Sequence, residues 1–401
     1  MTVRVGLGLR GRVAGRVGRS LKRVFFTLAA TLGGLLLALV MLESALRIRP
    51  EVFSYRVQNL AFSKYDVLPD GVNVAVPSIR MQFMRPDFRT EFGFLGHWWE
   101  HVGDQRGFRN PPGLGQPEVL LLGDSLIYGH GVEEVQTVAH FLRTDHGHPT
   151  YNMAKQGDCL YDHYVRFRMF APELRPRVVL LFVFLNDFQD LESRRRPSER
   201  PGFPEIDEYD YTVIRARVAA LVAVRPPWLA RTMFRLHSVR LMVQAYRHLD
   251  EILARFEITR SAEAAEEPDP PFLAPILDRD RFRPLAGYYE RILPDIDRRC
   301  RELDARLVVV NLELFKPKRS VRYREAQDVA SELVQSICSR HDIKLVDTAT
   351  LFGEDWRDAY LPRDGHLTEY GHRRLADFVA RKALTDGEPV LDDSRRQVSS
   401  N

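Results

Sequence analysis

The chain of 401 residues is poor in cysteine, with only Cys159, Cys300 and Cys338. Three cysteines are too few, and odd in number, for a disulfide framework. A single disulfide bond in an oxidising compartment remains an alternative. None of the three has the spacing of metal ligands, so we predict no structural zinc site and no other metal or cofactor. The glycine-rich stretch at residues 6–18 follows no strand and is therefore not a phosphate loop.

The first 23 residues lack acidic side chains, and a long uncharged run follows them. The run Val24–Leu42 has 19 residues without a charge, which at about 1.5 Å per residue just spans a hydrocarbon core of roughly 30 Å. A cleaved signal peptide has an apolar region of only about 7–15 residues. Ser44 and Ala45 could form a cleavage site, but Glu43 disfavours it. The basic residues before the run are Arg4, Arg10, Arg12, Arg16, Arg19, Lys22 and Arg23.

This pattern predicts an uncleaved signal anchor with the N-terminus in the cytoplasm and the chain after about residue 47 outside it. The basic N-terminus is thereby explained by membrane topology. The total net charge is +4, and the chain beyond the basic N-terminus is close to neutral. We therefore expect no nucleic-acid partner.

We predict five parts along the chain. They are a basic cytoplasmic segment at 1–23, a transmembrane anchor at 24–46, an extracytoplasmic approach segment at 47–115, an α/β domain at 116–385 and a disordered tail at 386–401. The approach segment shows little periodicity. Its aromatic stretch 92–101 is interpreted as packing at a domain edge.

From residue 118 onward, short apolar runs alternate with longer segments of helical period. Runs rich in Val, Leu and Ile are typical of strands buried on both faces of a parallel sheet. The alternation predicts an α/β fold with three α/β/α layers around a doubly wound parallel sheet of five strands. The runs are 118–125, 150–154, 177–187, 306–314 and 343–348, and the expected helices are about 136–147, 160–171, 281–304, 321–341 and 369–384.

The segment 190–280 is too long for an ordinary crossover and is interpreted as a helical insertion. Its stretch 212–249 has helical period, with a break at Pro226 and Pro227, and is rich in arginine. Two interpretations stay open, a helical hairpin with a solvated basic face or a basic amphipathic surface on anionic lipid. The acidic stretch 261–271 is expected to be a mobile loop. The arginines are Arg215, Arg217, Arg225, Arg231, Arg235, Arg240 and Arg247.

Residues just beyond the apolar runs supply the parts that acyl transfer by a serine needs. Ligands of doubly wound sheets bind outside the carboxyl ends of the strands. Ser125 is the candidate nucleophile, His366 the candidate base and Asp364 the group that orients the imidazole. His372 is a weaker candidate for the base and is interpreted as lying on a helix surface.

The same strand ends offer donors for a developing oxyanion. We expect the backbone N–H groups of Ser125 and Gly157 and the side-chain amide of Asn186 to form this hole. Gly157 is suited to the role because a residue without Cβ lets backbone approach a ligand closely. Asp124 and Asp187 are expected in supporting positions.

Taken together, Gly123-Asp124-Ser125-Leu126, Gly157, Asn186-Asp187 and Asp364/His366 resemble the four blocks of the SGNH (GDSL-type) hydrolases. The resemblance covers roughly 116–190 and 300–384 and implies the three-layer fold and the roles given above. The anchor followed by "GFRN" is similar to membrane-bound bacterial members.

Two positions depart from the family pattern. Phe184 replaces the glycine of the usual Gly-x-Asn-Asp block. The last block reads Asp364-Gly365-His366, with Arg363 at the usual Asp position. This shorter spacing is similar to SGNH-like proteins that O-acetylate bacterial exopolysaccharides.

We therefore predict a serine esterase in the bacterial inner membrane, with its catalytic domain on the periplasmic side, that removes acyl groups, acetyl foremost, from an envelope glycan or small ester. The first alternative is an O-acetyltransferase for a cell-surface polysaccharide, which differs only in the acceptor. The second is a non-catalytic module that binds glycan or a partner in envelope assembly. A lipase with the arginine-rich insertion as a lid is a further alternative.

Overall fold

The computed structural model describes residues 8–62, 73–194, 210–224, 228–229, 233, 236–247, 270–313, 320–353, 355–362 and 364–385. The predicted tail 386–401, most of the expected acidic loop, and Arg225, Arg231, Arg235 and Arg363 lie outside these residues. The three cysteines lie within them, each buried as a free thiol.

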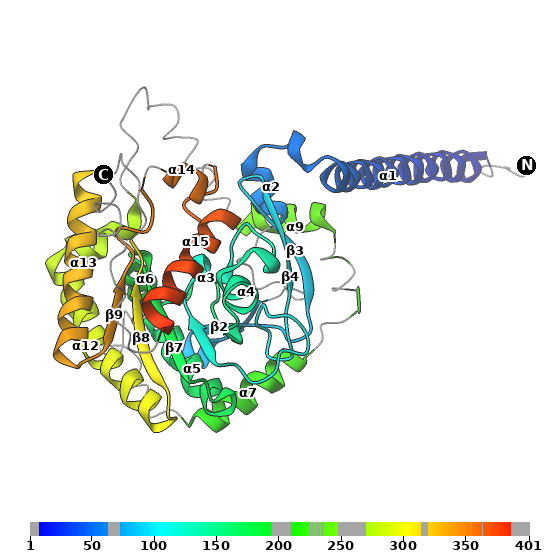
Figure 1. Cartoon of the computed structure of the whole chain (residues 1–401). Coiled ribbons are helices and arrows are strands. Elements are labelled where there is room, and N and C mark those ends of the chain that lie inside the picture. Colours follow the sequence, from blue (N-terminus) through cyan, green and yellow to red (C-terminus); the bar gives the residue numbers. More distant parts are fainter. Residues whose placement is uncertain are drawn as a thin grey trace, which may run out of the picture.

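A five-stranded parallel sheet forms the centre of the molecule (Figure 1). Its spatial order is β6-β5-β7-β8-β9, the flavodoxin-like order with the first strand second from the edge. Every residue of β5, β6 and β7 is buried, because both faces of the sheet are covered. The predicted sheet is confirmed. The strands are β5 (Val119–Leu122), β6 (Thr150–Asn152), β7 (Val178–Val183), β8 (Arg306–Asn311) and β9 (Lys344–Asp347).

Two layers of helices cover this sheet. α4 packs against α15, whereas α12 packs against both α5 and α13. Right-handed crossovers in this strand order put these two groups on opposite faces. The five expected helices are all present, as α4 (Val138–Thr144), α5 (Leu160–Leu174), α12 (Arg279–Glu302), α13 (Val321–Arg340) and α15 (Glu369–Val379), which the π-helical turn η6 (Ala380–Leu384) extends.

The approach segment forms two β-hairpins rather than irregular chain. β1 (Asn73–Val76) pairs with β2 (Met81–Met84), and β3 (Arg89–Phe94) pairs with β4 (His97–Val102). The two-residue turn of the second hairpin has Leu95 at φ 50° and Gly96 at φ 87°, the left-handed pair that matches strand twist. Trp99 is fully buried in the core, which agrees with the interpretation of this aromatic stretch as packing.

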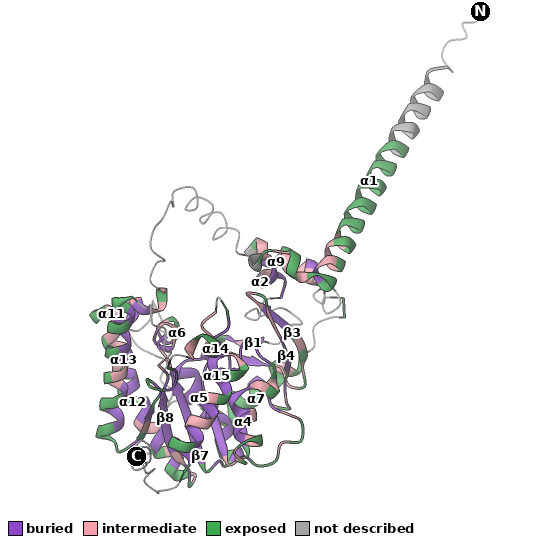
Figure 2. Cartoon of the chain, turned by 45° about the horizontal axis from the view of Figure 1, so that its top comes forward, coloured by how far each residue is buried: buried purple, intermediate pink, exposed green. Residues whose placement is uncertain are grey.

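The long helix α1 (Gly8–Ile48) projects from the globular part, and its residues 22–38 are exposed (Figures 1 and 2). Within the described residues, its part Lys22–Ile48 is the one helix long and apolar enough to cross a membrane. The 3-10 turn η1 (Pro50–Val52) and α2 (Tyr55–Ala61) follow it.

The insertion contributes α7 (Tyr211–Ala223) and α9 (His237–Arg247), and α9 packs against both α1 and α2. Glu43 of α1 joins them by accepting hydrogen bonds of 2.8 Å from Ser238 N and Ser238 Oγ at the start of α9. Leu46, Ala61 and Phe62 form the buried centre of this contact. We refer to α1 residues 42–48, α2 and α9 as the anchor cluster.

Candidate active site

Ser125 stands where β5 ends and the single-turn helix α3 (Ser125–Tyr128) begins. Asp124 caps this turn, because its Oδ1 accepts a hydrogen bond of 2.9 Å from Leu126 N. Gly123 has to be small, since a Cβ there would meet Ile127 at 2.7 Å. The turn-forming residues of the first block thus place one hydroxyl at the carboxyl edge of the sheet.

Asp364 and His366 lie in the loop between α14 (Trp356–Ala359) and α15. An isolated β-bridge between Tyr360 and Leu367 closes this loop, and Thr368 caps α15 directly after it. The closure turns the loop back toward the carboxyl edge of the sheet, which α15 covers on one side.

The three predicted triad residues meet in an unbroken line of contacts. His366 Nε2 is 2.7 Å from Ser125 Oγ, and His366 Nδ1 is 2.6 Å from Asp364 Oδ1. Burial alone would raise the pKa of Asp364, but the adjacent ring nitrogens of His130 and His366 outweigh it and hold that pKa far below its usual range. Asp364 therefore stays ionised and can orient the imidazole.

His130 completes this arrangement, and the sequence analysis missed it. Its Nε2 lies 3.3 Å from Asp364 Oδ2, and its fully buried ring stacks on His366 at 3.9 Å between centroids. The rings of Trp99 and Phe94 contact it from the second hairpin, at 4.5 and 5.1 Å. Its position five residues after Ser125, in the loop of the first block, was the one signal in the sequence.

The second hairpin also contacts the anchor cluster. Trp98 packs edge-on against Phe62 at 4.4 Å, while the next residue, Trp99, faces His130. At the hairpin's turn, His97 Nε2 lies 3.1 Å from the carbonyl oxygen of Pro362, in the loop of Asp364. One hairpin thus links the end of α1 to the candidate active site.

"GFRN" holds the loops around this site. The buried Arg109 donates to the carbonyls of Gly129 and Val132 at 2.9 and 2.8 Å, beyond the turn that carries Ser125. Asn110 pairs with the backbone of Asn152 in β6 through hydrogen bonds of 3.0 and 2.8 Å. The motif is thus a structural clamp for the strand ends.

Asn186 begins α6 (Asn186–Arg194), directly beyond β7. Its Nδ2 donates to Asp124 Oδ2 at 3.0 Å, which ties the third block to the residue next to Ser125. Gly157 has φ 72°, and a Cβ there would meet no atom within 4 Å. The space on the side-chain side of Gly157 is therefore open. The ring of Phe184 lies 6.4 Å from that of Phe272.

Two carboxyl groups of α6, those of Asp187 and Asp190, lie near the charge of Asp124. Asp187 Oδ2 accepts from Phe184 N at 2.9 Å, and burial, followed by the charge of Asp124, raises the pKa of Asp187 well above its usual range. The same two causes raise the pKa of Asp190 to about 7. Asp190 thus changes its protonation near neutrality.

We expect Asp190→Asn to stabilise the protein at pH 8 and to leave its stability at pH 4 unchanged. Because the folded pKa of Asp190 lies above the unfolded one, the native state loses stability as pH rises from about 4 through 7. An uncharged amide removes this loss, which is on the order of 4 kcal/mol for a shift of about three pKa units. Urea unfolding of the wild type and the variant at both pH values measures the difference in unfolding free energy. An equal effect at both would contradict the assignment.

The interpretation of His372 as a helix-surface residue is wrong. His372 is fully buried, because it belongs to the face of α15 that also buries Leu375, Ala376 and Val379. Burial, together with the charge of Arg109, lowers the pKa of His372 to about 3.

Among the described residues, His130, Asp364 and His366 are the group whose ligand atoms lie close enough together for a metal ion, within 4.8 Å. Both ring nitrogens of His366 already contact Asp364 and Ser125. A cation would have to break one of these contacts. The geometry therefore suits proton transfer better than metal binding.

Comparison with known proteins identifies the family of the chain. A sequence profile of the GDSL-like Lipase/Acylhydrolase family matches residues 121–374, more than half of the chain. The chain belongs to this family, and its class of activity is ester hydrolysis. No curated protein matches the chain significantly.

Several solved structures are similar to the chain at low identity. TesA is 12% identical with a TM-score of 0.36, covering 66% of this chain and 96% of that one. The esterase EstA from Pseudoalteromonas sp. is 10% identical with a TM-score of 0.36, covering 66% and 94%. A catalytic mutant of the acetylxylan esterase Axe2 from Geobacillus stearothermophilus is 13% identical with a TM-score of 0.37, covering 66% and 93%. The family assignment rests on the profile match.

Proposed function

We propose that the chain is a membrane-anchored serine esterase that works through an acyl-enzyme. The line of contacts from Asp364 through His366 to Ser125 carries this proposal. Ser125 Oγ attacks the ester carbonyl while His366 Nε2 takes the hydroxyl proton and then passes it to the leaving alcohol. Water, deprotonated by the same nitrogen, then releases the acyl group from Ser125.

Two further groups support this cycle. Asp364 stabilises the imidazolium that forms on His366, and its second oxygen is held by His130. The amide of Asn186 and the backbone N–H groups of Ser125 and Gly157 supply the oxyanion hole. Asp124 positions Asn186 through the 3.0 Å hydrogen bond, and Asp187 holds the turn before it.

We expect Asn186→Ala to lower kcat by about 10²–10³-fold, because one donor to the oxyanion is lost. The variant should keep its KM for a soluble ester within about threefold, since the donor acts mainly in the transition state. Steady-state kinetics measures both. Ser193→Ala, on the exposed side of the same helix, is the matched control. A change in KM with kcat unaltered would contradict the assignment of Asn186 to the oxyanion hole.

The proposed substrate is a glycan or small ester that carries a short acyl group, acetyl foremost. Ser125 is only 7% exposed, which favours a small acyl group over a long chain. The length and apolar composition of α1 support a membrane anchor for the domain, and its basic N-terminal flank predicts a domain outside the cytoplasm. A p-nitrophenyl ester series from acetate to octanoate tests the acyl preference, and acetate should give the highest kcat/KM.

The short Asp364-x-His366 spacing favours one second candidate, transfer of the acyl group to a polysaccharide hydroxyl. The chemistry up to the acyl-enzyme is the same, and exclusion of water decides the acceptor. Turnover of an acetyl ester with and without an oligosaccharide acceptor separates the two. An esterase releases acetate in both reactions, whereas a transferase needs the sugar and acetylates it.

A further inference from the structure

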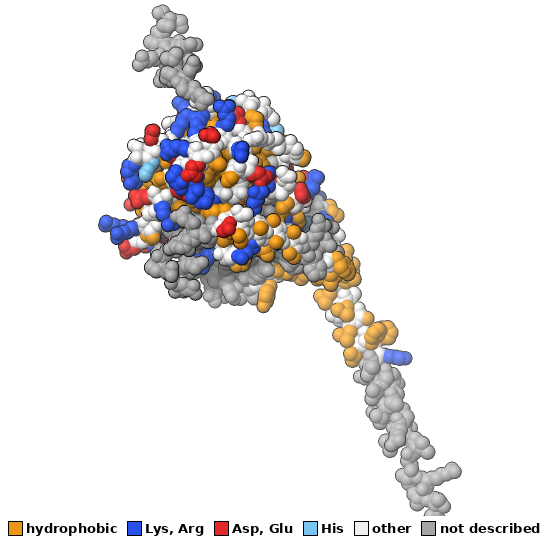
Figure 3. Space-filling model, turned by 90° about the horizontal axis from the view of Figure 1, so that it is seen from below, with side chains coloured by type: hydrophobic (Ala, Val, Ile, Leu, Met, Phe, Trp, Pro, Cys, Tyr) orange, Lys and Arg blue, Asp and Glu red, His pale blue; other side chains and the backbone are white. Residues whose placement is uncertain are grey.

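One buried lysine lies beside the proposed oxyanion hole, and the reaction steps described above do not use it. Basic side chains usually reach solvent, as do the blue ones on the face in Figure 3, but Lys155 is only 6% exposed. It follows β6, and its backbone N donates to the carbonyl oxygen of Gly123, two residues before Ser125, at 3.2 Å. Burial of an ammonium group costs free energy, so a specific gain has to offset it.

The ammonium contacts the peptide group that carries one of the proposed oxyanion donors. Lys155 Nζ donates to the carbonyl oxygen of Gln156 at 3.0 Å. That carbonyl and the N–H of Gly157 belong to the same peptide group, and in a trans peptide they point in opposite directions. The ammonium therefore lies on one side of this group, and the N–H donates on the other side. Asp158 N donates to the carbonyl of Lys155 at 3.2 Å, so the lysine belongs to the turn that it contacts.

This contact makes the N–H of Gly157 a stronger donor. A cation at the carbonyl oxygen draws electron density toward that end of the peptide group, so the N–H becomes more positive. Hydrogen bonds in series strengthen one another, and a bond from a charged donor is roughly twice as strong as a neutral one. The effect is larger on an oxyanion than on the carbonyl of a bound ester, because only the oxyanion carries a developed charge. The contact therefore favours the transition state.

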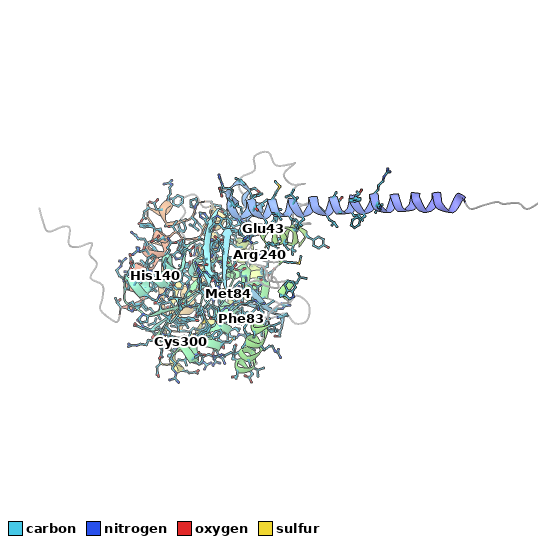
Figure 4. All side chains as sticks on the ribbon, turned by 90° about the vertical axis from the view of Figure 1, so that its right-hand side faces the viewer. Glu43, Phe83, Met84, His140, Arg240 and Cys300 are labelled. Carbon is cyan, nitrogen blue, oxygen red and sulfur yellow. The ribbon has the colours of Figure 1, made fainter. Side chains whose placement is uncertain are left out.

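The carboxylate nearest to Lys155 in the sequence is held by a different cation. Asp158 accepts hydrogen bonds from Arg166 Nε and Nη2, at 2.6 and 3.1 Å, and both side chains are 1% exposed. The guanidinium of Arg166 also lies 4.8 Å from the ring centroid of Phe83, in β2, which Figure 4 labels together with Met84. This pairing leaves the ammonium of Lys155 to the backbone carbonyl.

A second ion pair holds the other side of the same turn. Arg194, the last residue of α6, donates to Asp162 Oδ2 at 3.2 Å and to the carbonyl oxygen of Gly157 at 3.3 Å. Asp162 also accepts a hydrogen bond of 3.1 Å from the backbone N of Cys159. Because α6 begins with Asn186, one helix joins two of the proposed oxyanion donors. The turn around Gly157 is thus held in place, and its N–H has a fixed direction.

The ammonium changes its protonation close to neutral pH. Burial, opposed by the charge of Asp158, lowers the pKa of Lys155 to about 8. Burial also lowers the pKa of the neighbouring histidines, that of His101 to about 3, so both are neutral in this range. The charged and titratable groups around Lys155 are Asp158, Asp162, Arg166, Arg194, His101 and His163. Loss of charge at this site above pH 8 is therefore assigned to Lys155.

We propose that Lys155 is a positioning residue of the oxyanion hole, which polarises the peptide group of Gln156 and Gly157 and aims its N–H at the substrate oxygen. The inference rests on the esterase chemistry proposed above and adds to it a cation that acts through the backbone. Because this cation strengthens a donor that works mainly in the transition state, its effect belongs to kcat rather than to KM.

The first test is Lys155→Met in the full chain, since methionine has a similar length but neither charge nor N–H. We expect kcat for a soluble acetyl ester to fall by about tenfold, less than for loss of a whole donor, and KM to stay within about threefold. Lys344→Met is the matched control, because Lys344 Nζ also donates to a backbone carbonyl, that of Ala383, but lies at the amino end of β9. It should leave both constants unchanged.

The pH profile separates an electrostatic role from structural support. The wild-type kcat should fall as the pH rises above about 8, because Lys155 loses its proton. Lys155→Met should lack this alkaline limb, so the ratio of the two kcat values should shrink between about pH 7 and about pH 10. A ratio that stays constant over this range would show structural support alone and would overturn the proposal.

A second variant, Lys155→Gln, keeps an N–H at the site without the charge. It should lose less kcat than Lys155→Met and should also lack the alkaline limb. Wild-type kcat in both variants, or a change in KM alone, would overturn the role of Lys155 and leave the esterase proposal standing. A wild type that does not hydrolyse esters would instead refute the catalytic proposal, and the role of Lys155 with it.

Discussion

Ser125→Ala is expected to lower kcat/KM for a short acetyl ester by about 10⁴-fold or more, because no other group can form the acyl-enzyme. His366→Ala should cost about as much, since nucleophile and base act as one unit. Steady-state kinetics on purified protein measures both, and thermal unfolding should show Tm values within a few degrees of the wild type.

The double variant of Ser125 and His366 sharpens this result. If both residues serve one step, the double variant should be scarcely worse than either single variant. His372→Gln serves as the comparison variant, because His372 was the second candidate for the base. Its imidazole is fully buried, and we expect it to affect stability rather than the chemical step. A His366 variant that keeps most of the activity would refute the assignment of the base.

Asp364→Asn is expected to give the second large effect, a loss of about 10⁴-fold in kcat, by analogy with other triads in which the amide selects the wrong imidazole tautomer. In this protein the substitution also removes the negative charge that both His130 and His366 contact. The measurement is kcat for an acetyl ester, with Asp358→Asn, an exposed residue of α14, as the matched control.

The same substitution has a pH-dependent effect on stability. The folded pKa of Asp364 lies below its unfolded value, so its carboxylate stabilises the native state above the ordinary Asp pKa. That contribution is lost as the pH falls below about 4. Asp364→Asn should therefore lower the unfolding free energy at pH 7 and have a diminishing effect at lower pH. A constant effect across this range would contradict the ion-pair explanation.

The central sheet and its helices could be predicted because their physics is local. The apolar runs at 118–125 and 177–187 are long enough, and bounded clearly enough, to indicate buried strands. Once the order of the strands is known, the right-handed crossover rule gives the face of the sheet on which each connecting helix lies. The candidate site then follows, since Ser125, Asn186 and His366 all lie beyond strand ends.

The features that the sequence did not reveal depend on contacts between distant segments. The ring of His130 stacks on that of His366, which lies 236 positions later in the chain. His372 is buried because α4 covers its face of α15. The hairpins of the approach segment were missed because β3 alternates only partly, and its turn residues, Leu95 and Gly96, do not form one of the strongest hairpin signals.

The extra contacts of Asp364 suggest how a short Asp-x-His block can still work. Only Gly365 separates Asp364 from His366, and the 2.6 Å contact leaves the second carboxylate oxygen to His130. The stacked ring of His130 limits rotation of His366, and the aromatic pair Phe94 and Trp99 encloses it. Orientation of the base thus depends on the second hairpin as well as on its own loop.

The most direct test of the account is whether Ser125 is an activated nucleophile. Full-length protein in neutral detergent is treated with a fluorophosphonate, and its intact mass is compared with that of Ser125→Ala treated in the same way. We predict one stoichiometric adduct on the wild type and none on the variant. A folded wild type that stays unmodified, or a variant that reacts equally, would contradict the serine-esterase account and favour a module that binds its ligand without catalysis.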